Sequence, residues 1–317
     1  MWKMPGKSSR PSWAMWWSRV ATLSSAMPRR SPILTFECLT SRGALSLGAA
    51  LLALGGQACA ADLGNGAAAH SAASPATNVG QTTAIYRVYN HGLHVVDATA
   101  DYTLTELGYG IRTTLHAGGF MSLFLRMDIQ STAQGHFDHD WVHPVGYESA
   151  GYSRGRHRSV VLQYADDAPH IVTLDPKESD REDVPQAELS HSMDTLSAMA
   201  LLLENVRHTG RCDGNAHVFD GLRLSAMTSH GPFKGEVPET FGQKFKGIAL
   251  RCDFVGQQEA GFIKDSSHLD VMKAPHPGSA WFQDIPGVGL TAVRIEFEHP
   301  KLGQMTAVLD HTPVIQP

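Results

Sequence analysis

Apolar and polar residues alternate along most of the chain from residue 84 onward, and a period of two is typical of strands with one buried face. Turn residues that tolerate positive φ separate the first runs, at Asn90-His91-Gly92 and at Gly108-Tyr109-Gly110. We predict strands at residues 85–89, 93–104, 111–117, 126–135, 145–152, 157–164, 170–174, 216–219, 222–227, 244–254, 291–298 and 304–309.

One segment has the period of a helix instead. Its apolar residues fall on one face at helical spacing: Leu196, Met199, Ala200, Leu203 and Val206. Asp194 is a favourable N-cap, and Gly210 is a typical residue for ending a helix. We therefore predict one principal helix over residues 194–208, with its Leu196/Met199/Leu203 face buried.

Three connections stand out between these elements. Residues 120–125 are short and apolar, so we predict a buried turn of helix or a plug. Residues 136–144 and the acidic, proline-containing residues 176–190 are predicted to be loops. The fold class that follows is mainly β, with about ten to twelve strands. We expect a single antiparallel curved sheet, a β-spiral or open barrel, with one principal α-helix.

The first sixty residues carry an export pattern. Arg29, Arg30 and Arg42 precede an apolar run at residues 44–54, which is too short to span a bilayer, since spanning needs about 20 helical residues. An A-x-A motif ends at Ala60, so we predict a signal peptide cleaved after Ala60 and a periplasmic mature protein. Acylation of Cys59 is an open alternative.

The composition predicts three segments of the chain: a signal peptide, a linker and a domain. Residues 1–60 are predicted to be the signal peptide, with a spurious extension at 1–26 that leaves the true start codon open. Residues 61–81 are predicted to be a flexible linker and 82–313 a β-rich domain. The full chain has a net charge of −5, and loss of the basic signal makes the mature protein more acidic. An acidic balance argues against nucleic acid as a partner.

Two cysteines remain once Cys38 and Cys59 leave with the signal peptide. An even number of cysteines in an oxidising compartment indicates a disulfide, here between Cys212 and Cys252. The bridge closes a loop of ~40 residues and is worth about 4 kcal/mol in the chain-entropy description. We assign the pair to structure alone.

A histidine cluster is the most metal-like group in the sequence. His136, His139 and His143, with Asp138 or Asp140, offer the imidazole and carboxylate ligands that zinc uses. Their spacing matches no known ligand pattern, and a polar turn between strands explains them equally well. We assign no metal and no cofactor, and keep these histidines as weak candidates for a metal-dependent hydrolase.

Signatures of other chemistry are missing from the sequence. It contains no G-x-S-x-G nucleophile elbow and no glycine-rich phosphate loop between a strand and a helix. We therefore predict a protein that is not an enzyme and assign no catalytic residues.

Several short segments resemble the domain-of-unknown-function family 3108 of exported bacterial proteins. They occur in the family's order at residues 86–98, 119–124, 144–147, 194–198 and 218–223, together with the cysteine pair. The resemblance covers roughly residues 84–309. It implies an exported, β-rich envelope protein with no assigned activity and no catalytic residues.

The function that we expect is therefore a periplasmic binding or scaffold protein that supports the cell envelope. Its partner would be an envelope lipid or another envelope protein, and the mature form would have no transmembrane segment. Two alternatives stay open: a lipid or acyl-chain carrier, and the metal-dependent hydrolase. A continuous apolar cavity inside the β-domain would favour the carrier.

Overall fold

A computed structural model describes residues 80–138, 141–153 and 155–316. The predicted signal peptide, Cys59 and most of the predicted linker lie outside these residues, as do His139 and Asp140. The account of the fold below concerns the described residues alone.

Fourteen strands form one continuous sheet path, and a fifteenth short strand pairs beside it. The first half of the chain contributes β1 (Gln81–Asn90), β2 (Leu93–Leu104), β3 (Gly108–Ala117), β4 (Asp128–Asp138), β5 (Trp141–Ser153), β6 (Arg156–Ala165) and β7 (Ala168–Asp175). The second half contributes β8 (Ser192–Met193), β9 (Gly214–Phe219), β10 (Leu224–Glu236), β11 (Ile248–Ala260), β12 (His276–Ile285), β13 (Gly289–His299), β14 (Gly303–Leu309) and β15 (Val314–Gln316).

The sheet is built from two meanders that meet at β1 and β14. Neighbours from β1 to β7 pair antiparallel, as do neighbours from β14 back to β9, whereas the two-residue β8 pairs parallel to β9. The halves join through antiparallel pairing in which Tyr86 lies opposite Leu309. The prediction of one mainly antiparallel sheet is confirmed. Three strands were not predicted: the short β8 and β15, and β12 with its Gly/Pro/Ser-rich start.

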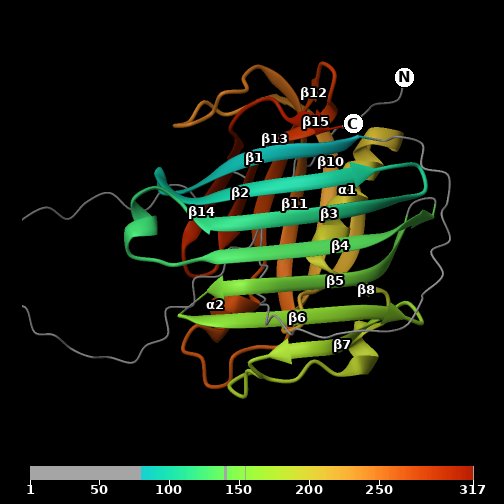
Figure 1. Ribbon diagram of the computed structural model, residues 1–317, viewed down its shortest axis with the longest axis vertical. Helices are drawn as coiled ribbons and strands as arrows, with labels where there is room; N and C mark the ends of the chain where they lie inside the picture. The colour runs from blue at the N-terminus through green and yellow to red at the C-terminus, as the bar shows by residue number, and fades with distance from the viewer. Residues whose placement is uncertain (1–79, 139–140, 154, 317) are drawn as a thin grey trace, which may run out of the picture. The chain divides into compact units, whose positions relative to one another are not determined.

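The sheet curls until its ends meet. β7 and β8 occupy opposite ends of the path, yet they are in contact, and the backbone N–H of His191 donates to the carbonyl of Asp167 at 2.7 Å. Figure 1 shows β1 to β7 as one wall, with β10 to β13 crossing behind it. The right-handed twist of strands accumulates over so many neighbours and turns an open sheet into a nearly closed barrel.

The principal helix, α1 (Thr195–Thr209), lies between these two walls (Figure 1). Both predicted caps are present: Asp194 accepts from the Ser197 N–H at 2.9 Å, and Gly210 is left-handed with φ 67°. Leu196 and Ala200 are buried as expected, whereas Met199 and Leu203 are only half-buried. These two residues face a cavity inside the barrel. A second, shorter helix, α2 (Leu269–Lys273), was not predicted.

The connection between β3 and β4 contradicts its prediction. The 3-10 helix η1 (Gly119–Leu123) is indeed a turn of helix, but none of its residues is buried. Phe120, Leu123 and Phe124 are 69%, 73% and 73% exposed. The prediction of a buried plug was wrong because this connection projects beyond the ends of the strands instead of folding back into the barrel.

The predicted loop at residues 136–144 was also wrong. β4 continues to Asp138 and β5 begins at Trp141, and His136 lies directly opposite His143 in their register. Val142 is completely buried, which fixes the inner face of this hairpin. The histidines take the outward positions of a continuing alternation.

Candidate binding cavity

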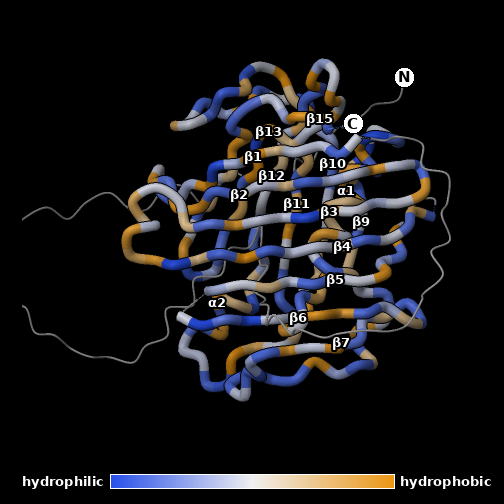
Figure 2. Tube along the Cα trace, viewed as in Figure 1, coloured by the Kyte–Doolittle hydropathy of each residue, from blue (hydrophilic) through white to orange (hydrophobic). Residues whose placement is uncertain are grey.

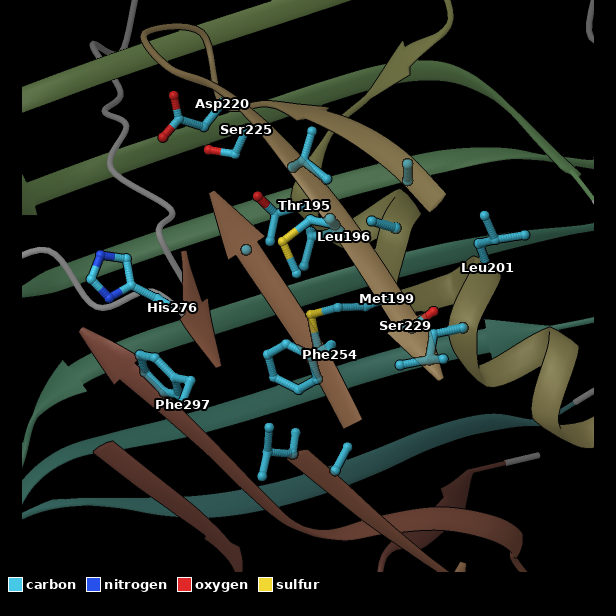
Figure 3. Close-up of a pocket in the computed structure, with 18 of the residues that line it drawn as sticks. Thr195, Leu196, Met199, Leu201, Asp220, Ser225, Ser229, Phe254, His276 and Phe297 are labelled. Carbon is cyan, nitrogen blue, oxygen red and sulfur yellow. The ribbon is translucent and has the colours of Figure 1, made fainter. Parts of the chain in front are cut away.

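A cavity of about 400 Å³ lies inside the barrel between α1 and the strands around it. Figure 3 shows Met199 of α1 pointing toward the ring of Phe254 on β11, with Asp220 and His276 at one side and Leu201 and Ser229 at the other. Most lining residues are apolar, so the cavity offers a hydrocarbon-like interior.

Alanine at inward-facing positions explains why this space is not filled. Ala98 and Ala100 occupy the inner face of β2, and Ala292 and Ala307 line the cavity from β13 and β14. A strand with leucine or phenylalanine at these positions would reach the helix. The alternation of β2 was visible in the sequence, but which neighbours face these alanines depends on the closure of the sheet.

A cavity of this size is unusual for a packing defect. Protein interiors contain few voids larger than one water molecule, and a water takes up about 30 Å³ in the liquid. A partly open space of this size, lined mostly by apolar side chains, is a candidate ligand site.

Two buried polar atoms at the cavity have no partner among the described residues. Thr113 on β3 is only 3% exposed, and its Oγ1 makes no hydrogen bond there. His276 engages the Val271 carbonyl through Nε2 at 2.9 Å, while its Nδ1 is left unpartnered. A buried hydroxyl without a partner is costly, so each atom is a candidate contact for a polar group of a ligand. The sequence analysis missed both residues.

Arginine side chains provide charge at one end of the cavity. Arg223 donates from Nε to Asp220 at 2.8 Å, and Arg181 donates to the Gly261 carbonyl at 2.7 Å and to Glu178 at 3.0 Å. Burial, and then the neighbouring charge of Arg223, lowers the pKa of Arg181. Glu178 is itself almost completely buried, so this part of the predicted acidic loop is packed rather than solvated.

A polar network anchors the beginning of α1 outside the cavity. The buried carboxylate of Asp194 accepts from the Ser197 hydroxyl at 2.5 Å and from the Tyr164 hydroxyl at 3.2 Å. Tyr109 donates to the Ser197 hydroxyl at 2.6 Å. Desolvation raises the pKa of Asp194, and the hydrogen bonds from Ser197 oppose that rise. Because none of these four residues lines the cavity, we assign the network to holding the helix.

The described residues include only part of the predicted metal cluster. His136 and His143 are exposed on the outer face of the β4–β5 hairpin, and His143 lies 3.8 Å from Asp138 and 3.4 Å from Asp167. Within the described ranges, no three histidine, cysteine, aspartate or glutamate side chains are grouped to hold a metal ion. His139 and Asp140 fall in the gap between those ranges, so a metal site at these histidines stays an open alternative.

The predicted disulfide is present. Cys212, which follows the end of α1, bridges to Cys252 on β11, and their Cα atoms are 5.7 Å apart. Both side chains are buried, and the Cys212 N–H donates to the Gly231 carbonyl at 3.0 Å. The bridge joins the exit of the helix to the second half of the sheet.

The fold and the cavity together define a barrel-like β-protein whose apolar interior is shared with one helix. The chain belongs to the family described as "Protein of unknown function (DUF3108)", which matches residues 85–310. The resemblance inferred from the short segments is thereby confirmed, and the family assigns no activity.

Comparison with solved structures finds a related architecture in the "Crystal Structure of Beta-barrel-like Protein of Domain of Unknown Function DUF1849 from Brucella abortus". The identity is 12% and the TM-score 0.45, over 75% of this chain and 99% of that one. No curated protein matches the chain. Among the described residues, no helix combines the length and the apolarity needed to cross a membrane.

Proposed function

We propose that this protein is a periplasmic, non-enzymatic carrier that binds an acyl chain or a lipid of the cell envelope inside its barrel. The apolar cavity of about 400 Å³ carries the proposal. Small-molecule sites typically occupy about 300–1,000 Å³ and combine an apolar lining with a few polar groups. This arrangement suits a ligand that is mostly hydrocarbon.

The polar groups at the cavity limit the classes of ligand that suit it. Thr113 places one unpartnered hydroxyl inside the cavity, and Arg181 and Arg223 bring guanidinium groups to one end of it. Because both guanidinium groups are already paired with Asp220 and Glu178, the free Thr113 hydroxyl is the feature that favours an amphiphile with one polar group. A bulky polar metabolite is less suitable, because its hydroxyl groups would be buried against alanine, phenylalanine and methionine.

The periplasmic location is supported by two independent features. The first 60 residues carry the basic, apolar and A-x-A pattern of a secretory signal. The Cys212–Cys252 bridge suits a compartment in which thiols are oxidised. Immunoblotting of periplasmic and cytoplasmic fractions tests the location directly, and a protein confined to the cytoplasm would overturn it.

Titration with cis-parinaric acid, a fluorescent fatty acid, tests the cavity. Ala100→Phe places a ring inside the cavity and should weaken binding by about tenfold or more, equivalent to about 1.4 kcal/mol. Ala150→Leu on β5 is the matched control, because Ala150 does not line the cavity. Equal binding by the two variants, or no binding by delipidated wild-type protein, would overturn the carrier proposal.

Native mass spectrometry of protein purified from the periplasm separates the carrier from a scaffold. A carrier should retain a molecule with the mass of a fatty acid or lipid, which organic extraction removes. A scaffold should be found without such a ligand and should bind another envelope protein in a pull-down instead.

A further inference from the structure

The connection between β3 and β4 forms a protruding apolar tip, defined here as Phe120, Leu123 and Phe124. A backbone hydrogen bond from Ala117 to the Met127 carbonyl, 3.1 Å long, closes the base of the connection. The three side chains are 69–73% exposed. The rings of Phe120 and Phe124 lie 4.9 Å apart, so they form one apolar surface. Figure 2 shows this connection as a largely hydrophobic projection beside β2.

The base of the tip is held firmly against the sheet. The Gly118 N–H donates to the Val95 carbonyl at 3.0 Å. A Cβ on Gly118 would lie 2.6 Å from Nε2 of His94, and one on Gly119 would lie 2.6 Å from the His94 carbonyl oxygen. Glycine thus permits the close approach that fixes the direction of the tip.

An aromatic and cationic group begins two residues after the tip, at Arg126. The guanidinium of Arg126 sits over the Tyr152 ring at 4.6 Å, and Tyr152 contacts the His157 ring edge-on at 5.3 Å. Tyr152 is also the register partner of Asp128 at the start of β4. Amphipathic aromatic and basic side chains beneath exposed apolar ones match the order of environments at a membrane surface.

The tip shares one rim of the barrel with a mouth of the cavity. Lys301, in the β13–β14 turn, is exposed and lines the cavity. That turn is tied to the end of β1, because the Asn90 side chain donates to the Leu302 carbonyl at 2.9 Å. β2 begins directly after the two-residue β1–β2 turn, and its His94 lies close to Gly118 and Gly119 at the base of the tip. The β1–β2 turn therefore lies between two features of this rim, the Lys301 turn and the base of the tip.

We propose that the apolar tip docks the protein on a lipid bilayer, with Phe120, Leu123 and Phe124 inserted at the interface. Docking would place the cavity mouth at the membrane surface, where an acyl ligand is taken up or released; this second step rests on the proposed carrier function. A protein partner is less suitable, because stable protein interfaces bury about 1,200–2,000 Å² in total. Three side chains on a single short connection offer far less.

Vesicle flotation without added ligand tests the docking. We use vesicles of phosphatidylethanolamine and phosphatidylglycerol, the delipidated wild type, and a Phe120→Ser/Leu123→Ser/Phe124→Ser variant. The wild type should float with the vesicles, and the variant should lose binding by about tenfold or more, because its apolar contact is removed. The matched control is Val172→Ser/Ile248→Ser, which removes two exposed apolar side chains elsewhere and should float like wild type.

A second measurement reports insertion directly. The fluorescence of Phe124→Trp should shift to the blue on vesicle addition, whereas that of Val172→Trp should not. Loss of flotation in the control variant alone, or a tip variant that floats like wild type, would overturn the proposal. A wild-type protein that does not bind vesicles but dimerises through the tip would also overturn the proposal.

Parinaric acid titration without vesicles separates this proposal from the carrier proposal. The tip variant should bind the fatty acid as tightly as wild type, since none of its substituted residues lines the cavity. If wild type floats but binds no fatty acid, the docking stands and the carrier function fails. If it binds fatty acid but does not float, the docking fails alone.

Discussion

Tyr109 on β3 and Ser197 on α1 are joined by a hydrogen bond of 2.6 Å across 88 positions of sequence. Both groups are buried, so the wall of the barrel holds the first turn of the helix directly. The position of α1 determines the cavity, because Met199 and Leu203 lie on the same helix a few residues further on.

Removing this contact should loosen the helix without abolishing the fold. Tyr109→Phe deletes one buried hydrogen bond, and we expect a loss of about 1 kcal/mol in the free energy of unfolding. Urea denaturation followed by circular dichroism measures it. Tyr152→Phe on the outer side of β5 is the control and should change stability little. A Tyr109→Phe protein as stable as wild type would show that the bond does not anchor the helix.

Asp194 should make stability depend on pH. Burial raises the pKa of its carboxyl in the folded state, so the folded protein holds the proton more strongly than the unfolded chain. This contribution favours folding below the ordinary aspartate pKa and is lost as pH rises toward the raised, folded-state pKa.

Asp194→Asn keeps a good N-cap but does not titrate. The stability difference between the variant and wild type should therefore shift in favour of the variant as pH rises from about 4 toward neutrality. Urea unfolding at several pH values tests this. A constant difference between the two proteins would contradict the raised pKa.

Thr113→Val should raise the stability of the ligand-free protein and lower its affinity for a fatty acid. Valine has the shape of threonine without the unpartnered hydroxyl, so the delipidated variant should be more stable by about 1 kcal/mol. Thermal unfolding measures this gain. The same variant should bind parinaric acid less tightly if Oγ1 contacts the carboxyl group, and a destabilised empty variant would mean that Oγ1 has a partner after all.

Loss of the disulfide should act on stability alone. Cys212→Ser/Cys252→Ser opens the loop that the bridge closes, and the chain-entropy description gives a loss of about 4 kcal/mol. Chemical denaturation measures the loss, and parinaric acid titration of the folded variant should give wild-type affinity. Weaker fatty-acid binding at temperatures where the variant is folded would show that the bridge also shapes the cavity.

The sequence pattern predicted those features of the fold that interactions between near neighbours determine. The alternation of β1 to β7 and the caps at Asp194 and Gly210 need only near neighbours, and they were recovered from the sequence. The cavity could not be recovered in the same way, because Ala100, Thr113 and Phe254 come together only when two distant halves of one sheet face each other.

The errors also have a physical origin. The buried turn or plug at residues 120–125 was predicted because this run is short and too apolar for a surface strand, whereas the connection projects past the sheet and leaves its apolar residues exposed. The turn end of the β4–β5 hairpin was mistaken for a loop because its outward side chains, such as His136 and His143, are polar. Too few inward apolar residues, such as Val142, are present there to make the alternation visible.

The pairing of β1 with β14 joins the two ends of the described domain. Because Tyr86 lies opposite Leu309, the seam between the two meanders needs both ends of that domain to be present. Until then each meander is an open sheet with a bare edge, and such distant pairing slows folding. The edge of β1 therefore stays open to other chains until β14 pairs with it.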